Sequence, residues 1–313
     1  MSIVGALIGV VLAASPVWGE EDTVRVCGKN WPSDATKVTC EGSPYSSTLR
    51  DGRLPETLAQ LTQLEILELR RLTLKDCSVL SKLTTLRQLE LAHTRVAEPE
   101  CLAAAKSVVR LALREAKIDD LSALKALPML RELSLPPHTQ DLRPLAPLKA
   151  LESLDLRGSR ASDLSPLAEL TSLKHLVLQG ASEVRDGKPL KRLVALEHLD
   201  MTATGVVDVK WAKRLVLLKT LLLGDTAVKD LRSLKGLEGL MTLNVAGTPL
   251  KRLPSVGRWG QLKTLVLTDT FVTKIWALRK LESLRQLDLV GTEVSEERLL
   301  KLREALPECV IEH

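Results

Sequence analysis

The chain has 313 residues, of which 45% are hydrophobic but only 2% aromatic, with a single Phe (Phe271) and a single Tyr (Tyr45). Globular cores normally use aromatic side chains as bulky fillers, so this composition argues against an ordinary core and favours many thin layers filled by Leu, Val and Ala. The 44 cations and 39 anions are scattered without a dense basic block, and few aromatics are present to stack on bases, so we expect no nucleic-acid partner.

The first residues have the pattern of an export signal. Ile3 to Ala14 form an uncharged apolar run, and acidic Glu20 and Glu21 follow it closely. The run is short for a bilayer span, so we predict a signal peptide over 1–19, cleaved after Gly19, and no stable membrane span. An uncleaved anchor is the alternative, since the basic residue expected before the run is missing.

Residues 20–60 are predicted to form an N-terminal cap. Two short β-prone stretches, Thr23 to Cys27 and Lys37 to Cys40, lie within it, and Leu54 to Leu58 lead into the next region. We expect this cap to cover the exposed apolar end of a stack of repeats.

A repeat occupies most of the remaining chain, 61–294. From Leu64 onward the pattern L-x-x-L-x-L recurs at a nearly constant spacing, which deviates once by one residue in each direction. Such a fixed period is the signature of stacked repeats. The central Leu recurs eleven times, at Leu67, Leu89, Leu111, Leu133, Leu154, Leu176, Leu199, Leu221, Leu243, Leu265 and Leu287.

Each L-x-L segment alternates as a strand does, so its Leu side chains share one face and the intervening residues share the other. Eleven such strands predict a parallel sheet on the order of 50 Å long, at roughly 4.8 Å per strand. The second half of each repeat, such as Asp163 to Leu170, indicates a short helical turn that returns apolar residues to the sheet. These turns are wider than a strand, so we expect the stack to curve with the sheet on its concave side.

These repeats resemble the leucine-rich-repeat family, specifically the 22-residue class of internalin-like bacterial surface proteins and of a regulatory subunit of protein phosphatase. The resemblance runs from about Leu54 to the C-terminus. It implies an α/β solenoid, a curved horseshoe of about 11 repeats with a parallel concave sheet and short helical or 3-10 turns on the convex side.

One departure from the family concerns the turn after the strand. The Asn that the family places five residues after the central Leu, where it forms a ladder, is replaced here by Thr, whose hydroxyl offers fewer donors. Elsewhere the position holds Leu72, Ala116, His138, Ser159 and Ala181, so the ladder is broken in the N-terminal half, and we expect that half to be less regular. The Thr residues are Thr94, Thr204, Thr226, Thr248, Thr270 and Thr292.

Residues 295–313 are predicted to form a C-terminal helical cap. Ser295 followed by Glu296 and Glu297 is typical of a helix start, Pro307 ends the helix, and Cys309 to Ile311 form a last strand. The predicted apolar face comprises Leu299, Leu300, Leu302 and Leu306.

The cysteines fit an exported protein. Cys27 and Cys40 lie in the predicted cap, and we predict a disulfide between them. Cys77 falls where neighbouring repeats carry a buried Leu and is interpreted as a small core residue, while Cys101 and Cys309 have no evident partner. Because there is no C-x-x-C pair, we expect no redox or zinc site, no metal and no cofactor.

The outward residues of the strands are the candidate binding surface. Its N-terminal part is charged, with mixed signs, whereas its C-terminal part is small or apolar and has few charges to repel a partner. The alternative is that Thr and Val are simply good strand formers. The predicted protein-binding residues are Arg110, Arg114 and Arg157 in the charged zone and Thr220, Leu222, Thr242, Asn244, Thr264, Val266, Thr268 and Val290 in the neutral zone.

A polar cluster separates the two zones. His175 and His198 occupy one column in successive repeats, which predicts Cβ atoms about 5 Å apart, and Asp200 lies beside them. Two imidazoles and a carboxylate can bind a metal, but nothing else in the sequence completes a coordination shell. Two solvated polar residues are therefore the preferred interpretation.

A basic stripe recurs on the convex turns. It is consistent with attraction to anionic envelope polymers or lipid headgroups, or with a solvated edge that keeps a long solenoid soluble. Trp211 and Trp276 lie on the same turns and are expected to be partly exposed, whereas Trp259 takes a core Leu position. The stripe comprises Lys82, Lys125, Lys191, Lys213, Lys235, Arg258, Lys280 and Lys301.

No catalytic motif is present, neither H-E-x-x-H, nor G-x-S-x-G, nor a phosphate-binding loop, so we expect no enzyme. The leading hypothesis is a monomeric binding module, secreted or periplasmic in a bacterial envelope, that holds a protein or peptide on its concave sheet. The alternatives are an envelope or cell-surface adhesin that uses the basic stripe, and an intracellular regulatory subunit of a phosphatase-like enzyme, which the leader and the predicted disulfide disfavour.

Overall fold

The structure is a computed structural model that describes residues 23–42, 49 and 51–313. The predicted signal peptide, 1–19, lies outside the described residues.

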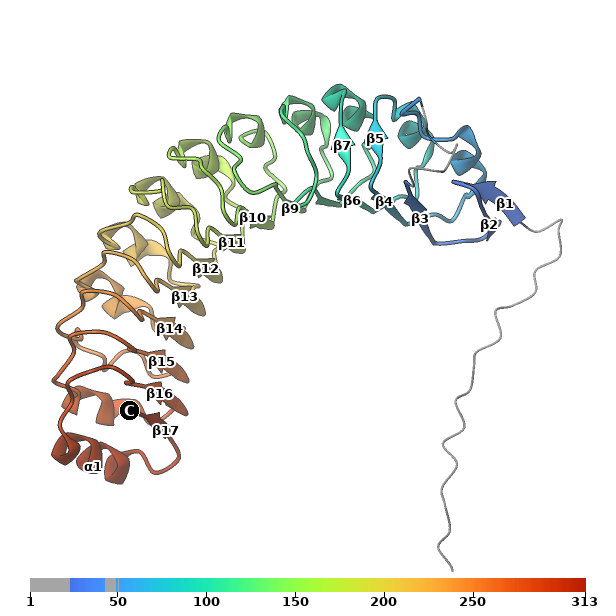
Figure 1. The fold of residues 1–313 in the computed structure, drawn as a ribbon. Coiled ribbons are helices and arrows are strands. Elements are labelled where there is room, and N and C mark those ends of the chain that lie inside the picture. The colour runs from blue at the N-terminus through green and yellow to red at the C-terminus, as the bar shows by residue number, and fades with distance from the viewer. Residues whose placement is uncertain (1–22, 43–48, 50) are drawn as a thin grey trace, which may run out of the picture.

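The molecule is an arch whose inner side is a single parallel sheet (Figure 1). Eleven of its thirteen strands carry the central Leu residues of the repeats, and one strand from each cap extends the sheet at its two ends. The strands, in spatial order, are β3 (Lys37–Glu41), β4 (Ile66–Arg70), β6 (Gln88–Ala92), β8 (Arg110–Ala112), β9 (Glu132–Ser134), β10 (Ser153–Asp155), β11 (His175–Val177), β12 (His198–Asp200), β13 (Thr220–Leu222), β14 (Thr242–Asn244), β15 (Thr264–Val266), β16 (Gln286–Asp288) and β17 (Val310–Glu312).

The convex side consists mainly of short 3-10 helices, as the repeat pattern predicts, although no helix lies between β14 and β15. Because a helix is wider than the strand that pairs with its neighbour at about 4.8 Å, the stack bends away from the helices. The helices are η2 (Glu56–Gln60), η3 (Ser78–Lys82), η4 (Pro99–Ala104), η5 (Ser122–Ala126), η6 (Arg143–Leu145), η7 (Ser165–Glu169), η8 (Lys188–Arg192), η9 (Lys210–Arg214), η10 (Arg232–Gly236) and η11 (Trp276–Lys280).

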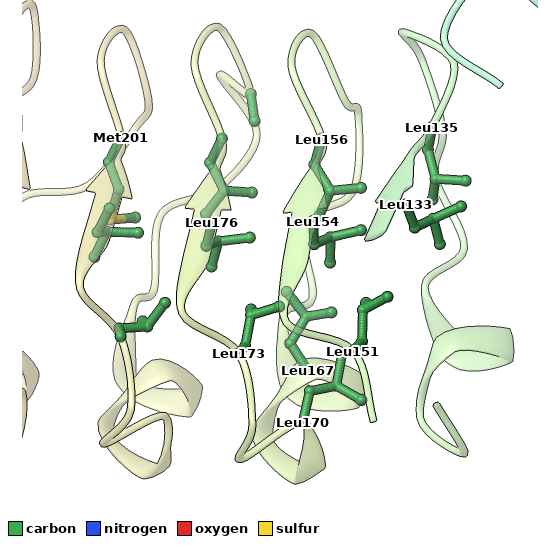
Figure 2. Packing of buried hydrophobic residues seen from close by; sticks show 14 of the residues in the cluster. Leu133, Leu135, Leu151, Leu154, Leu156, Leu167, Leu170, Leu173, Leu176 and Met201 are labelled. Carbon is green, nitrogen blue, oxygen red and sulfur yellow. The ribbon is translucent and has the colours of Figure 1, made fainter. Parts of the chain in front are cut away.

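The core is a stack of Leu layers between the sheet and these helices. Adjacent strands pair with the central Leu residues in register, for example Leu154 with Leu176. Figure 2 shows Leu154 and Leu156 projecting from β10 above Leu167 and Leu170, which come from η7 and the residue after it. All four are buried. Complete burial of one Leu contributes about 1.5–3 kcal/mol, so each layer is stabilised chiefly by contact with the next.

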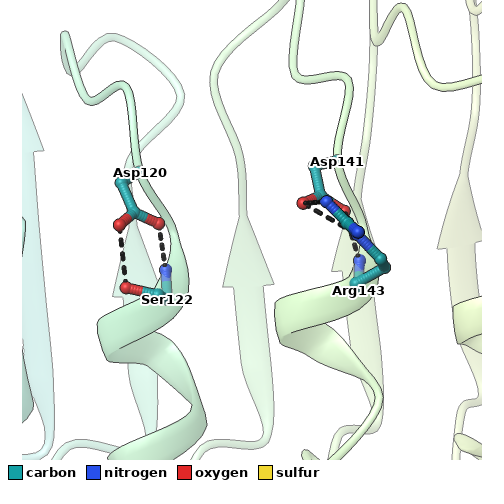
Figure 3. A network of polar contacts seen from close by, with 4 residues as sticks. All are labelled: Asp120, Ser122, Asp141 and Arg143. Carbon is teal, nitrogen blue, oxygen red and sulfur yellow. Dashed lines mark hydrogen bonds and ion pairs between the residues drawn. The ribbon is translucent and has the colours of Figure 1, made fainter.

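An Asp residue fixes the start of several 3-10 helices. The Asp120 side chain accepts hydrogen bonds from the backbone N–H of Ser122 at 2.7 Å and from its hydroxyl at 2.9 Å, and Asp141 accepts from the backbone N–H of Arg143 at 2.9 Å (Figure 3). This satisfies a helix N–H that has no partner within the helix. The same backbone contact recurs at Asp76, Asp163, Asp186, Asp208 and Asp230.

The Thr column does not form the ladder between repeats that the sequence suggested. Thr204 donates to the carbonyl of Met201 at 2.7 Å, within its own turn, and Thr226, Thr248, Thr270 and Thr292 donate in the same way. Thr94 alone among them also donates to the preceding repeat, at Leu69 O. A hydroxyl has one donor hydrogen, so it closes one turn and leaves the bridging of repeats to backbone pairs.

Most turns after a strand donate a backbone N–H to the next repeat, as Asp225 does to Ala246 O at 2.8 Å. Pro137 has no N–H to donate, and His138, at a left-handed φ of 73°, donates instead to Gly158 O of the next repeat at 2.9 Å. Within the described residues no backbone hydrogen bond joins this turn to the turn after β8 in the preceding repeat. A cavity of about 590 Å³ opens between this turn and the segment Ala116 to Leu121 of the preceding repeat.

The N-terminal cap contains the predicted disulfide. β1 (Thr23–Val26) pairs antiparallel with β2 (Lys29–Pro32), a strand that the sequence did not indicate. Cys27 is bonded to Cys40, with the two Cα atoms 5.3 Å apart, which confirms the pairing. The bond ties the β1–β2 turn to β3, the first strand of the main sheet.

A second disulfide corrects the interpretation of Cys77 and Cys101. These residues are bonded to each other, with Cα atoms 4.9 Å apart. Cys77 is buried in the core as predicted, but it is bonded, and Cys101 does have a partner. The bond joins the residue before η3 to η4 in the next repeat. Nearby, β5 (Thr73–Leu74) and β7 (Arg95–Val96) form a small parallel sheet across the same two repeats.

The C-terminal cap is helix α1 (Glu296–Ala305), followed by β17. Leu299, Leu302 and Leu306 are buried as predicted, whereas Leu300 is exposed. Leu300 was assigned to the apolar face in error, because it follows Leu299 by one position and so points about 100° away from it.

Trp211 is buried, contrary to the expectation that it is partly exposed. Its indole occupies space left by Gly187 in the preceding repeat, where an added Cβ would lie 2.3 Å from the ring. The indole N–H donates to Asp208 O at 3.1 Å. Trp276 is exposed and Trp259 fully buried, as predicted.

We predict that Cys77→Ala/Cys101→Ala lowers the free energy of unfolding by about 2–4 kcal/mol, because the open chain gains conformational entropy when unfolded. Urea unfolding under non-reducing conditions measures the change. Cys309→Ala is the control, since Cys309 is outside both disulfides. An unchanged urea midpoint in the double variant would contradict the bond.

We predict that the Asp contacts stabilise the fold only above acidic pH. The N–H and hydroxyl of Ser122 lower the pKa of Asp120, and the guanidinium and N–H of Arg143 lower the pKa of Asp141. Their contribution is present above the unfolded pKa of about 4 and is lost as pH falls through the lower folded pKa. Asp120→Asn/Asp141→Asn therefore lowers the Tm at pH 7, and the difference from wild type shrinks below pH about 4. Glu183→Gln serves as control, and a difference that does not change with pH would refute the assignment.

Candidate functional site

The concave face is built by the residues that alternate with the buried Leu side chains. The register of β13, β14 and β15 aligns Thr220, Thr242 and Thr264 in one row. Leu222, Asn244 and Val266 form a second row in the same register. The structure thus brings six residues of the predicted neutral zone together on three adjacent strands, whereas Thr268 follows β15 and Val290 follows β16.

The members of the neutral zone differ in exposure. Leu222 and Val266 are half-buried, whereas Val290 is exposed at the turn after β16. Thr268 has a buried hydroxyl without a hydrogen-bond partner among the described residues. Leu222 and Val266 therefore present apolar surface between the Thr side chains.

Asn244 has a structural role that the sequence did not reveal. Its Oδ1 accepts a hydrogen bond from the backbone N–H of Ala246 at 2.9 Å. Asp155, Asp200 and Asp288 hold the equivalent N–H two residues later in their repeats. This second-row position therefore shapes the end of the strand, and Asn244 has only part of its hydrogen-bonding capacity left for a ligand.

The charged zone is largely neutralised within itself. Arg110 lies 2.7 Å from Glu132, and Asp155 lies between Arg157 at 3.1 Å and Arg114 at 3.8 Å. All three guanidinium groups remain partly exposed. They are thus oriented by carboxylates while part of their donor capacity faces solvent.

The polar cluster lies between the two zones, on β11 and β12. His175 pairs with His198 in register, with their ring centroids 6.3 Å apart. Burial lowers the pKa of the half-buried His198 ring, Asp200 raises it and His175 lowers it. Among the described residues no group of three His, Cys, Asp or Glu side chains is arranged to hold a metal ion.

Ion pairs along one edge of the sheet were not predicted. Glu152 contacts both Arg131 and Lys174, the latter at 2.7 Å, and Glu197 contacts Lys219 at 2.5 Å. These contacts lower the pKa of Glu152 and of Glu197. These ion pairs could have been predicted from the sequence, because opposite charges separated by one repeat period lie side by side on neighbouring repeats.

The convex stripe is only partly neutralised. Lys82, Arg258 and Lys301 form ion pairs with Glu56, Glu238 and Glu297. Within the described chain, no ion pair involves the other members, Lys125, Lys191, Lys213, Lys235 and Lys280. No helix among the described residues has the length and apolar composition to cross a membrane.

Similarity to solved structures identifies the fold of this chain. An internalin, InlF, from Listeria monocytogenes superposes with a TM-score of 0.77 over 91% of this chain and 83% of its own, at 24% identity. The fold is a leucine-rich-repeat solenoid. The leucine-rich-repeat protein LIC12759 of Leptospira interrogans matches over 90% of both chains with a TM-score of 0.61 and 18% identity.

A plant peptide hormone receptor, RGFR1 in complex with RGF2, shares the solenoid over 78% of this chain and 46% of its own, with a TM-score of 0.56 and 16% identity. The sequence matches no protein-family profile and no curated protein at a significant level. These similarities establish the solenoid fold.

We predict that Asp200→Asn lowers the pKa of His198 further below about 6.5, because it removes the carboxylate that stabilises the imidazolium. The amide keeps an oxygen that accepts the N–H of Thr202, as Asn244 does for Ala246. An NMR titration of the imidazole protons measures the shift, and His175→Ala, which removes a repelling cation, should move the pKa upward. A His198 pKa insensitive to both changes would disprove this electrostatic coupling.

Proposed function

We propose that this chain is an exported binding module that holds a protein or peptide segment on the C-terminal half of its concave sheet, and that it is not an enzyme. The observation that supports this most is the uncharged surface of β13, β14 and β15, where Thr220, Thr242 and Thr264 flank half-buried Leu222 and Val266. A partner covering this surface does not have to strip water from a charge, which is costly.

The row of Thr220, Thr242 and Thr264 supplies hydrogen-bonding groups along one side of Leu222 and Val266. Hydroxyls donate and accept, so they suit the alternating N–H and C=O groups of an extended backbone. RGFR1, which is similar in fold, is seen in complex with the peptide hormone RGF2, and this supports a peptide ligand here.

The arginines toward the N-terminus provide a second contact region. Arg110, Arg114 and Arg157 are each held by a carboxylate and remain partly exposed. Arg is enriched at interfaces because its planar group makes several directed hydrogen bonds. A ligand that extends from the neutral zone past His175 would reach them with an acidic end.

Export is supported by the cysteines. Two disulfides, Cys27–Cys40 and Cys77–Cys101, fit an oxidising compartment, because cytosolic thiols are normally kept reduced. These bonds support our proposal that the protein works in the bacterial envelope or outside the cell, and they argue against an intracellular phosphatase regulator.

The test is affinity capture from the surface fraction of producing cells. We predict that Leu222→Glu/Val266→Glu loses a partner captured by the wild type, because two carboxylates then require desolvation at the contact. Val207→Glu/Phe271→Glu is the matched control, with the same charge added at exposed apolar residues that lie off the concave rows. Circular dichroism and urea midpoints verify that both variants fold. Equal capture by both variants would overturn the concave-face proposal.

A further inference from the structure

Three consecutive repeats concentrate positive charge on the convex side. Their 3-10 helices η8, η9 and η10 have the sequences KPLKR, KWAKR and RSLKG, and η9 contacts both neighbours. We call these eight cations the basic convex patch: Lys188, Lys191, Arg192, Lys210, Lys213, Arg214, Arg232 and Lys235.

Most of this charge is not neutralised. Arg192 pairs with Glu169, Lys188 with Asp186 and Arg232 with Asp230. The remaining five cations have no ion-pair partner anywhere in residues 23–42, 49 and 51–313. These are Lys191, Lys210, Lys213, Arg214 and Lys235.

The cations of η8 and η9 also converge in space. Lys191, Lys213 and Arg214 line one cavity of about 380 Å³ together with Lys188 and Lys210. Asp208 is the single acidic residue of that lining, and its carboxylate already accepts the backbone N–H of Lys210 at 3.0 Å. The cavity is therefore a local focus of positive potential.

Exposed aliphatic side chains occur in the same repeats. Val194 follows η8, and Val216 and Leu217 follow η9, each at the corner where the chain turns back toward the sheet. Their exposed fractions are 49%, 55% and 54%. Most other repeats have polar or small residues at these corners, such as Thr171–Ser172, Glu238–Gly239, Gly260–Gln261 and Glu282–Ser283.

The packing of the fold does not explain why unpaired cations and exposed aliphatic side chains occur in the same repeats. The Leu layers are filled without Val194, Val216 or Leu217, which project to solvent. Exposed aliphatic groups next to unpaired cations are what a surface for anionic lipid requires, since cations attract the headgroups and short apolar side chains enter the interface.

We infer that the basic convex patch, together with Val194, Val216 and Leu217, docks the solenoid on an anionic phospholipid surface. A protein partner is disfavoured because Lys is depleted from protein interfaces. Single-stranded nucleic acid is disfavoured because Trp211, the aromatic residue of these turns, is buried against Gly187. The patch lies on the opposite side from the sheet, so docking leaves the concave face open to a ligand.

The test is co-sedimentation of the full-length chain with vesicles of phosphatidylcholine alone and of phosphatidylcholine with phosphatidylglycerol. We expect binding to the anionic vesicles only, weakening as salt screens the charges. Lys191→Glu/Lys213→Glu should reduce the affinity by more than about 25-fold, at roughly fivefold per charge removed. Its matched control is Lys125→Glu/Lys280→Glu, which changes the same charge at equivalent stripe positions outside the patch and should have a much smaller effect.

The aliphatic residues are tested separately. Val216→Ser/Leu217→Ser should weaken vesicle binding severalfold with all cations in place, whereas Met129→Ser, at an exposed residue of the equivalent corner after η5, should not. Equal binding to both vesicle types would overturn the proposal, as would equal losses in the two charge-reversed variants. Unchanged binding by Val216→Ser/Leu217→Ser, with full competition by polyphosphate, would assign the patch to soluble polyanions instead and reject lipid docking.

Discussion

Each repeat depends on its neighbours for burial, because a single layer of Leu side chains is too thin to exclude water on its own. This requirement dictates the in-register pairing of central Leu residues along the sheet, as between Leu154 and Leu176. It also explains why both ends of the stack carry caps. At one end a disulfide joins Cys27 to Cys40 on the first strand, and at the other α1 packs Leu299 and Leu302 against the last repeat.

The sequence predicted the solenoid and its eleven repeat strands, because a constant repeat period places equivalent Leu residues one above another. The Cys27–Cys40 bond was predicted because both residues lie in the cap, outside the repeats. It failed where contacts do not follow that period. Cys77 bonds to Cys101, and Trp211 packs on Gly187, and both separations are longer than one repeat. An alignment of equivalent positions in successive repeats therefore does not place the two members of either pair beside each other. On the candidate site, the same alignment correctly grouped Thr220, Thr242 and Thr264. It did not show that Asn244 closes its own turn, since that contact lies within one repeat.

The same periodicity separates the two surfaces of the molecule. On the concave side, carboxylates orient the arginines of the charged zone, and the neutral zone offers hydroxyls around Leu222 and Val266. On the convex side the cations of η8, η9 and η10 have few acidic partners. A protein that rests on a surface by its convex side while its concave side stays open needs this division. The repeat supplies it because its strand faces the concave side and its 3-10 helix the convex side, with the Leu layers between them.

The turn at Pro136 and Pro137 is joined less closely to the repeat before it than to the repeat after it. Adjacent repeats in a solenoid are joined only through their shared interface, and the interface with the preceding repeat lacks a backbone hydrogen bond between the turns and has a cavity beside it. Both disulfides lie on the N-terminal side of this point and the long run of regular Leu layers lies on the other. Strands β8 and β9 still pair in register across this boundary. The sheet and the Leu layers, without a backbone hydrogen bond between the two turns, therefore join the disulfide-linked N-terminal segment to the part of the arch that carries the neutral zone.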